Sequence, residues 1–356
     1  MRICYFGGYN VKNTRNRILL KGFKEAGVDV IECNDRSTFP LNVIGLFKKH
    51  WVVRNKYDFM FIGFAGQGMV LFAKLITQKP VVLDSFISLY NTVIEDRGES
   101  SRYSARALYY YLLDWLSVRL ADYLVLDTWE HVKYFVEKFG AEKDKFLVIP
   151  VGADDSIFKL LPLPRHEKFT VGFQGTYIPL HGIEYILRAA KLLENHKDIE
   201  FKLLGNGQTY DEMRKIAYNL KLDDVTFIGI RVSLERLPDY IAEFDVCLGV
   251  FAKTTKALMV VPTKVYEYMA MGKAIITEDN PAVRNALKHK ENAYLVEPAN
   301  PDAIADAILI LKNDDKLRSE ISLNAKKLFS ENFTPEIICG KFIGEISKKI
   351  EAVHKN

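Results

Sequence analysis

The sequence predicts an α/β protein with two doubly wound, Rossmann-like domains, a cleft between them and a helical C-terminus. Three observations support this. Short β-rich runs alternate with amphipathic helical segments, one charged stretch with prolines interrupts the alternation at 159–168, and the same alternation then restarts. Alternating strands and helices indicate a parallel sheet covered on both faces. A chain of 356 residues also favours two domains over one.

The first half contains six predicted strands and five predicted helices. Runs rich in β-branched and aromatic residues predict strands at 2–6, 28–32, 58–63, 80–84, 123–127 and 146–150. Apolar residues at helical spacing between them predict helices at 15–26, 41–54, 67–77, 101–120 and 128–139. The interruption at 159–168 is the natural linker.

The second half repeats this pattern and then becomes helical. Strands are predicted at 169–174, 200–204, 225–229, 245–251, 274–277 and 293–296. Helices are predicted at 182–194, 209–220, 234–242, 262–271 and 281–287, followed by three more at 301–312, 315–329 and 334–353. The domains expected are therefore 1–160 and 168–330, with 331–356 as a C-terminal helix packing back toward the first domain.

Composition indicates a globular protein of a reducing compartment. The apolar fraction of 49% can supply substantial cores. Four scattered cysteines without C-x-x-C spacing read as buried thiols, neither a disulfide framework nor a zinc site. The apolar stretch 105–126 is interrupted by Asp114, Arg119 and Asp122, which makes it a poor membrane span. We expect a cytoplasmic protein, peripheral at the inner face of the membrane if it binds lipid, and no nucleic-acid partner.

The basic excess lies in the first half, where residues 1–165 hold 23 Lys and Arg against 18 Asp and Glu. The predicted helix at 41–56 mixes Lys48, Lys49, Arg54 and Lys56 with apolar and aromatic residues. Such a helix suits an anionic membrane surface or a phosphate-bearing acceptor. The alternative is a core helix with a solvated basic edge.

Residues 261–277 carry the strongest functional signal. Pro262 can open a helix and Gly272 can end it, so that Glu267 lies in the first turns of a helix that follows a strand. Ligands of open α/β sheets bind at such helix starts. A carboxylate there can accept both hydroxyls of a ribose, and Lys264, one turn earlier, can face a pyrophosphate. The alternative makes Glu267 a carboxylate that offsets the helix dipole and Lys264 a solvated surface residue.

This segment resembles the donor-site helix of the retaining family-four glycosyltransferases of group 1 type, which have the two-domain architecture called GT-B. The resemblance covers about residues 168–330, and its markers come in the family's order. They are the loop Gly172–Glu184, the strand end Leu203–Gln208, the segment Val225–Arg231 and the helix start Pro262–Glu267. The resemblance implies an acceptor-binding first domain and a donor-binding second domain.

Further site residues follow from the resemblance. It implies that Glu267 holds the ribose, that Lys264 and His181 face the diphosphate, and that Arg231 lies at the base edge. The other donor-binding candidates are Gly7, Gly8, Gly175, Thr176, Tyr177, Gly205, Asn206, Lys253 and Thr263. Gly7 and Gly8 do not form a G-x-G-x-x-G motif, so the pair can equally be a simple turn.

The chain departs from the family's pattern in two places. Most relatives carry Gly-Arg near Gly175 and a Lys before the glycine at 182, where this chain has Thr176 and His181. The family also commonly has two glutamates eight positions apart, and Met259 stands where the first would be. Because that carboxylate usually meets the transferred sugar, the loop 251–261 is expected to border the sugar and phosphates in its place.

Asp84 and His131 are the acceptor-side candidates. Asp84 ends the fourth strand and is expected to point into the cleft, where it could grip or deprotonate an acceptor hydroxyl. His131 is interpreted as a capping or surface histidine. No metal is expected, because no Asp-x-Asp motif ends a strand at a cleft and no His or Cys ligands cluster.

The function predicted is transfer of a sugar from a nucleotide-diphosphate donor to a glycan or polyprenol-linked acceptor, with Asp84, His181 and Lys264 as catalytic candidates. Retention follows if the resemblance holds. No cofactor is expected, since the nucleotide sugar is a substrate. Two alternatives remain: a catalytically silent GT-B subunit that binds nucleotide sugar or a partner, and another enzyme of this architecture such as an epimerase or phosphorylase.

Overall fold

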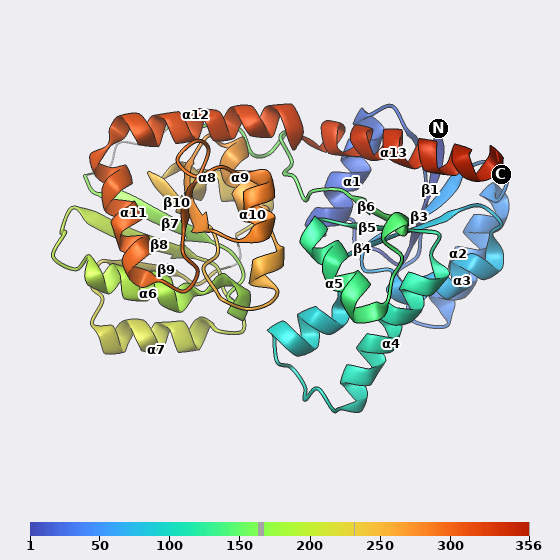
Figure 1. Cartoon of the computed structure of the whole chain (residues 1–356), viewed down its shortest axis with the longest axis horizontal. Helices are drawn as coiled ribbons and strands as arrows, with labels where there is room; N and C mark the ends of the chain where they lie inside the picture. The colour runs from blue at the N-terminus through green and yellow to red at the C-terminus, as the bar shows by residue number, and fades with distance from the viewer. Residues whose placement is uncertain (163–166, 231, 356) are drawn as a thin grey trace. The chain divides into compact units, whose positions relative to one another are not determined.

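The structure is a computed structural model that describes residues 1–162, 167–230 and 232–355, with the side chains of the last helix described through residue 352. The chain forms two compact units. Unit 1 comprises Met1–Val151 and the C-terminal segment from Thr334, and unit 2 comprises Gly152–Phe333. Each unit is a parallel sheet between helices (Figure 1).

Unit 1 is built on a six-stranded parallel sheet with the order β2-β1-β3-β4-β5-β6. Its strands are β1 (Arg2–Gly7), β2 (Asp29–Asn34), β3 (Phe59–Ile62), β4 (Val81–Phe86), β5 (Tyr123–Leu126) and β6 (Phe146–Val148). Its helices are α1 (Thr14–Glu25), α2 (Leu41–Val53), α3 (Val70–Ile76), α4 (Ala105–Leu120), α5 (Trp129–Phe139) and α13 (Pro335–Lys355).

The helices of unit 1 cover both faces of its sheet, and the alternating side chains of β1 show which helices lie on which face. Ile3 and Tyr5 of β1 belong to a core with residues of α1 and α13, such as Phe23 and Phe342. Cys4 and Phe6 of β1 belong to a separate core that includes residues of α2, α3, α4 and α5. Successive residues of a strand point to opposite faces, so α1 and α13 cover one face and α2 to α5 cover the other.

Helix α13 returns the end of the chain to unit 1, where it packs along α1. The two helices approach closely at Gly22, where an added Cβ would lie 2.2 Å from the carbonyl oxygen of Pro335. A glycine at this position therefore allows the contact.

Unit 2 contains a second six-stranded parallel sheet, with the order β12-β11-β10-β7-β8-β9. Its strands are β7 (Phe169–Gln174), β8 (Ile199–Leu204), β9 (Val225–Ile228), β10 (Val246–Leu248), β11 (Ala274–Glu278) and β12 (Tyr294–Val296). Its helices are α6 (Ile183–Leu192), α7 (Tyr210–Leu220), α8 (Leu237–Ala242), α9 (Thr263–Ala270), α10 (Pro281–Ala286), α11 (Pro301–Asn313) and α12 (Asp315–Asn332). Helices α6, α7 and α11 share one core with the sheet, while α9 packs against α12 and β11.

The predicted alternation of strands and helices is confirmed. Several bounds shift by a few residues, and three differences bear on the site or on the division into units. The strand predicted at 245–251 is only Val246–Leu248, because the chain beyond it is tied to other loops, with Phe251 N donating to the carbonyl of His181 at 3.2 Å. Helix α4 begins at Ala105, where Ser104 caps it. Leu160–Pro162, predicted as linker, line a cavity of unit 2 with Met271, so the units divide at residue 151 rather than near 160.

Candidate functional site

The candidate site lies where the strand order of unit 2 reverses. From β7 the chain runs outward through β8 and β9, then crosses to the other side of β7 to form β10. The carboxyl ends of β7 and β10 therefore flank a topological switch point, and ligands of open α/β sheets bind there. Gly175 follows β7 directly, and helix α9 begins after the loop that follows β10.

Helix α9 brings Lys264 and Glu267 to this point. Pro262 precedes its first turn with an extended backbone, and no side chain caps the helix there. The helix is buried along Lys264–Ala270, which leaves Lys264 only 4% and Glu267 only 5% exposed. The interpretation of Lys264 as a solvated surface residue is therefore wrong.

Glu267 is held by the end of β7. Its Oε2 accepts a hydrogen bond of 2.6 Å from Nε2 of Gln174. The backbone N–H of Gln174 in turn donates to the hydroxyl of Tyr268 at 3.1 Å. The first contact orients the carboxylate and the second ties helix α9 to strand β7, across 93 and 94 residues of sequence. The sequence pointed to Glu267 but not to Gln174.

Lys264 is a buried cation without a hydrogen-bond partner among the described residues. Its Nζ lies 3.8 Å from the centre of the Phe173 ring, within range of a cation–π contact. Burial lowers the pKa of Lys264 well below its usual value, and the Glu267 carboxylate opposes that shift. A desolvated ammonium is costly unless an anion accompanies it, so this position favours a negatively charged ligand.

His181 lies on the same side of Gly175 as Lys264. A Cβ added to Gly175 would be 2.8 Å from Lys264 Nζ and 3.2 Å from His181 Cε1, and Gly175 also has a positive φ of 156°. Glycine is thus required at this position on two counts. Nδ1 of His181 is buried and has no hydrogen-bond partner among the described residues.

The charge state of His181 differs from the sequence prediction. Burial, followed by the positive charges of Lys264 and Lys256, lowers the pKa of His181 well below its usual value. The ring is therefore neutral at pH 7, and His181 is not the second cation that the sequence predicted. It can instead donate or accept a hydrogen bond.

The other predicted donor residues of unit 2 are distributed around these three. Gly205 packs on Gly175, since an added Cβ would lie 1.9 Å from the carbonyl oxygen of Gly175. Asn206 donates from Nδ2 to the carbonyl of Gly229 at 3.1 Å. Thr176 and Lys253 are exposed, and Thr263 is the first residue of α9.

Tyr177 and Arg231 are the two remaining residues of unit 2 that were predicted to bind the donor. The Tyr177 side chain is fully buried in the core of unit 2 and donates to the carbonyl of Leu203 at 3.3 Å, so the prediction that it contacts the donor is wrong for its side chain. Arg231 lies outside the described residues.

Glu278, which the sequence analysis missed, lies at the carboxyl end of β11. Its Oε1 accepts from Asn280 Nδ2 at 2.8 Å, whereas its buried Oε2 has no hydrogen-bond partner among the described residues. Burial raises the pKa of Glu278 to about 7, and the Asn280 hydrogen bond opposes the shift. Asn280 also donates to the carbonyl of Ala257 at 3.0 Å, which ties this acid to the loop carrying Met259. The only local signal was a glutamate at a strand end.

The unit 1 candidates lie in a different environment. Asp84 is fully buried and receives two 3.0 Å hydrogen bonds from the guanidinium of Arg15. It does not offer a free carboxylate, contrary to the expectation that it points to an acceptor. Gly7 adopts a positive φ of 130° at the end of β1, and Gly8 is exposed.

His131 is not a surface residue, contrary to its sequence interpretation. It is 1% exposed, and its Nδ1 lies 2.5 Å from Oδ1 of Asp127. Its backbone N–H donates the N-cap hydrogen bond of α5 to Thr128 Oγ1 at 3.1 Å. Within the ranges that the structure describes, no three His, Cys, Asp or Glu side chains are grouped so that they could share a metal ion.

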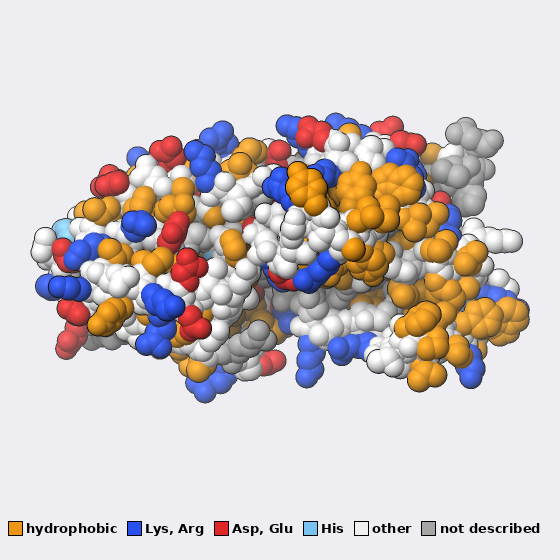
Figure 2. Space-filling view, turned by 90° about the horizontal axis from the view of Figure 1, so that it is seen from below, with side chains coloured by type: hydrophobic (Ala, Val, Ile, Leu, Met, Phe, Trp, Pro, Cys, Tyr) orange, Lys and Arg blue, Asp and Glu red, His pale blue; other side chains and the backbone are white. Residues whose placement is uncertain are grey.

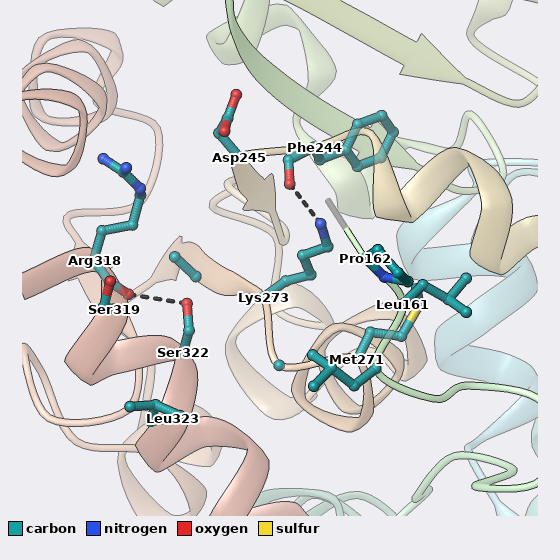
Figure 3. Close-up of a pocket in the computed structure, with 13 residues that line it drawn as sticks. Leu161, Pro162, Phe244, Asp245, Met271, Lys273, Arg318, Ser319, Ser322 and Leu323 are labelled. Carbon is teal, nitrogen blue, oxygen red and sulfur yellow. Dashed lines mark hydrogen bonds between the residues drawn. The ribbon is translucent and has the colours of Figure 1, made fainter. Parts of the chain in front are cut away.

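A cavity of about 740 Å³ lies at the opposite, amino end of the unit 2 strands, beside Asp245 and Ala274 (Figure 3). Its buried cation is Lys273, whose Nζ donates to the carbonyls of Ala242 and Phe244 at 2.7 and 2.8 Å. Because protein groups already satisfy this ammonium, the cavity lacks the unpaired charge that marks the switch-point site.

Comparison with known proteins shows which proteins the chain resembles. Residues 161–328 match the family model described as "Glycosyl transferases group 1". An uncharacterized glycosyltransferase of Haemophilus influenzae is 24% identical over 276 residues, with 76% of this chain and 74% of that protein covered. The chain spans about half or less of other relatives. One is the poly(ribitol-phosphate) alpha-N-acetylglucosaminyltransferase of Staphylococcus aureus, 27% identical over 52% of this chain and 37% of that protein.

A solved structure shares the fold over nearly the whole chain. HepE of Anabaena in complex with UDP superposes with a TM-score of 0.69 at 17% identity, covering 98% of this chain and 99% of that one. The predicted GT-B architecture is therefore confirmed.

Proposed function

Because residues 161–328 match the model of the group 1 glycosyl transferases, we propose that the chain moves a sugar from a uridine-diphosphate donor to a glycan or polyprenol-linked acceptor, with retention. The observation that carries the proposal is the Lys264 ammonium, buried without a hydrogen-bond partner in the described ranges at the switch point of unit 2. A diphosphate supplies the missing anion.

The neighbouring groups suit the rest of a nucleotide diphosphate. The first-turn amides of α9 and the positive end of its dipole add to the charge of Lys264. Gly175 has no side chain that would keep the diphosphate from the backbone beside Lys264, and Gly205 packs beneath it. Glu267, oriented by Gln174, accepts hydrogen bonds from the ribose hydroxyls. Uridine is proposed because HepE, which shares the fold, was solved with UDP.

The chemistry we propose depends on positioning and electrostatics. As the bond from the sugar to the diphosphate breaks, negative charge grows on the leaving phosphate, and Lys264 and the α9 amides stabilise it. The acceptor attacks the same face of the sugar, and the leaving phosphate accepts its proton, as the family resemblance implies. Neutral His181 donates a hydrogen bond in this scheme and adds no charge. No divalent cation takes part.

The acceptor we propose is a polysaccharide or a lipid-linked glycan. The Staphylococcus aureus relative, named for transfer to poly(ribitol-phosphate), supports a polymeric acceptor. A lipid-linked acceptor would require contact with a membrane, for which we propose peripheral binding through α2. Among the described residues, no helix is long and apolar enough to cross a bilayer.

The decisive experiment compares UDP, GDP and CDP as ligands of the parent and of Lys264→Met. A nucleotide that binds only the folded state raises the melting temperature by mass action. We expect UDP to stabilise the parent most and to lose its effect in Lys264→Met. Equal stabilisation of the two proteins by UDP would overturn the assignment of Lys264, and no response to any nucleotide would overturn the donor.

A second function is favoured by one observation, the methionine at position 259 in place of the family's first glutamate. A silent subunit that binds nucleotide sugar without transferring it would keep Lys264 and Glu267 but could dispense with that carboxylate. Incubation with radiolabelled UDP-sugars and extracted envelope glycans separates the two functions. Donor binding without labelled product would support the silent subunit.

A further inference from the structure

Helix α2 presents its apolar side to solvent. Its buried side chains are Leu46 and His50, while Leu41, Ile44, Phe47, Trp51 and Val52 are exposed. A helix that only covers a core would show the reverse. The interpretation of residues 41–56 as a core helix with a solvated basic edge is therefore wrong, although Leu46 belongs to the core.

Helix α4 has the same inverted distribution. Its buried side chains include Asp114 and Ser117, while Leu108, Tyr109, Leu112 and Leu116 are exposed on the outer side. Asp114 explains why this polar side faces inward, because its carboxylate accepts hydrogen bonds from Ser88 Oγ at 2.7 Å and from the amide of Tyr90 at 2.9 Å. The Asp114 carboxylate thus anchors the segment after β4, and the outer side of α4 is left apolar.

The two helices share one face of unit 1 with α3. Leu46, Val70 and Ala107, one from each helix, belong to a single core beneath them. Helix α3 adds Leu71 and Leu75 to the exposed apolar residues. Eleven side chains, exposed between 38% at Leu116 and 77% at Leu75, thus form what we call the outer apolar face: Leu41, Ile44, Phe47, Trp51, Val52, Leu71, Leu75, Leu108, Tyr109, Leu112 and Leu116. Figure 2 shows hydrophobic side chains gathered at the right of the view, over unit 1.

The charges around the outer apolar face have one sign. Segments 41–56, 67–79 and 101–120 contain one acid, the buried Asp114. Their nine basic residues are Lys48, Lys49, Arg54, Lys56, Lys74, Lys79, Arg102, Arg106 and Arg119. Among the described residues, salt bridges join Lys74 to Asp122 and Arg106 to Glu99, both acids outside these segments.

We propose that α2, α3 and α4 together form a docking surface for an anionic lipid bilayer. Apolar and aromatic side chains enter the interfacial region, and the surrounding Lys and Arg bind lipid phosphates. Arg54 stacks 3.8 Å from the ring centre of Trp51, which places an amphipathic pair at the depth of the headgroups. The proposal rests on the proposed function only in that a lipid-linked acceptor makes docking useful.

A second copy of the chain fits this surface less well. A symmetric dimer through the outer apolar face would oppose the same basic rim on both subunits, without exposed acids in these segments to neutralise it. Like charges across an interface disfavour association. An anionic bilayer provides both the apolar interior and the opposite charge.

The test is flotation of the full-length protein with phosphatidylcholine vesicles, with and without phosphatidylglycerol. Two variants separate the contributions. The charge variant changes Lys48, Lys49, Arg54 and Lys56 to Gln, and the α4 variant changes Leu108, Tyr109 and Leu112 to Gln. Matched controls on unit 2 change Lys197, Lys288, Lys316 and Lys327 to Gln, or Leu192, Tyr218 and Leu323 to Gln, all of them exposed.

We expect binding to anionic vesicles that weakens as salt rises from about 0.1 M to about 1 M, where the screening length falls from about 10 Å to about 3 Å. Each test variant should lower the affinity at least about tenfold, while the controls bind as the parent does. Equal binding to neutral vesicles, or unchanged binding by either variant, would overturn the proposal. A parent dimer that the α4 variant dissociates, without vesicle binding, would assign the face to a second copy.

Calorimetry with UDP on the same proteins separates this proposal from the proposed function. Loss of vesicle binding with intact UDP binding is the result expected of both test variants. A parent that binds UDP but no vesicles would refute the docking surface alone. A parent that binds vesicles but no UDP would refute the proposed donor alone.

Discussion

Arg15 of unit 1 and Lys264 of unit 2 are both buried basic side chains, and they differ in what surrounds the charge. In unit 1, Arg15 donates to both oxygens of Asp84 and, through Nη1, to the carbonyls of Ile149 and Pro150 at 2.8 and 3.1 Å. In unit 2, Lys264 Nζ lies over the face of Phe173 and has no hydrogen-bond partner in the described part of the chain.

This difference separates a structural charge from a binding charge. A buried ion pair whose hydrogen bonds are complete gains nothing from a further partner, and removing one member leaves the other uncompensated. A buried cation without a hydrogen-bond partner has lost its hydration and has no hydrogen bond in exchange. An anionic ligand can supply that interaction, which favours binding. Stability should therefore depend on the unit 1 pair, and ligand binding on the unit 2 lysine.

The largest expected effect is on folding. Asp84→Asn leaves the Arg15 guanidinium buried without its counter-ion and should lower the free energy of unfolding by about 3–5 kcal/mol, measured by urea denaturation. Asp239→Asn, which breaks an exposed contact with Arg236, is the control and should cost less than about 1 kcal/mol. A stability for Asp84→Asn equal to that of the control would show that the Arg15 pair is not structural.

Glu278 extends the comparison to an acid of unit 2. Its buried carboxylate has a hydrogen-bond partner among the described residues for only one of its two oxygens. Its folded pKa of about 7 lies above its ordinary value of 4.5, so the folded state retains the proton that the unfolded state loses. The contribution of Glu278 to the free energy of unfolding is fully present below the unfolded pKa. It decreases as the pH rises to the folded pKa, by about 3 kcal/mol in all. Glu278→Gln should remove that component, and denaturation curves of parent and variant with the same pH dependence would contradict it.

Lys264→Met tests the binding charge directly. Loss of a charge-assisted hydrogen bond should weaken UDP binding about 10- to 100-fold by calorimetry, while the free energy of unfolding stays equal or rises. The matched variant is Lys273→Met, which removes a buried lysine already bonded to two carbonyls at the other end of the sheet. That change should cost stability and spare UDP affinity; the reverse pattern would refute the distinction.

Glu267→Gln should have a smaller effect, because the amide can still accept a hydrogen bond from Gln174. We expect donor affinity to fall about tenfold, since one charged acceptor for the ribose hydroxyls is lost. The exposed Glu331 of α12 provides the control Glu331→Gln. Equal UDP affinity of Glu267→Gln and the parent would reject the ribose assignment.

The smallest expected effect is that of chelation. If Lys264 and the α9 amides stabilise the leaving phosphate, excess chelator should leave the rate of sugar transfer unchanged. Turnover that stops in chelator and returns with magnesium or manganese would show that side chains alone do not offset this charge.

The sequence by itself determined the two wound units and pointed to the helix start that carries the candidate site. Both follow from local signals: residue periodicity identifies strands and helices, and Pro262, Lys264 and Glu267 lie within one short helix start. Such signals need no knowledge of which distant segments meet.

Only the tertiary structure decided which charges are satisfied and which side of a helix faces solvent. The partner of Asp84 lies 69 residues away at Arg15, and the amide that holds Glu267 lies 93 residues away at Gln174. Likewise, the apolar side of α2 was expected inside or outside on equal grounds, until packing placed Leu46 and His50 against the sheet. The physical reason is that burial and pairing depend on contacts between distant segments, which local spacing does not specify.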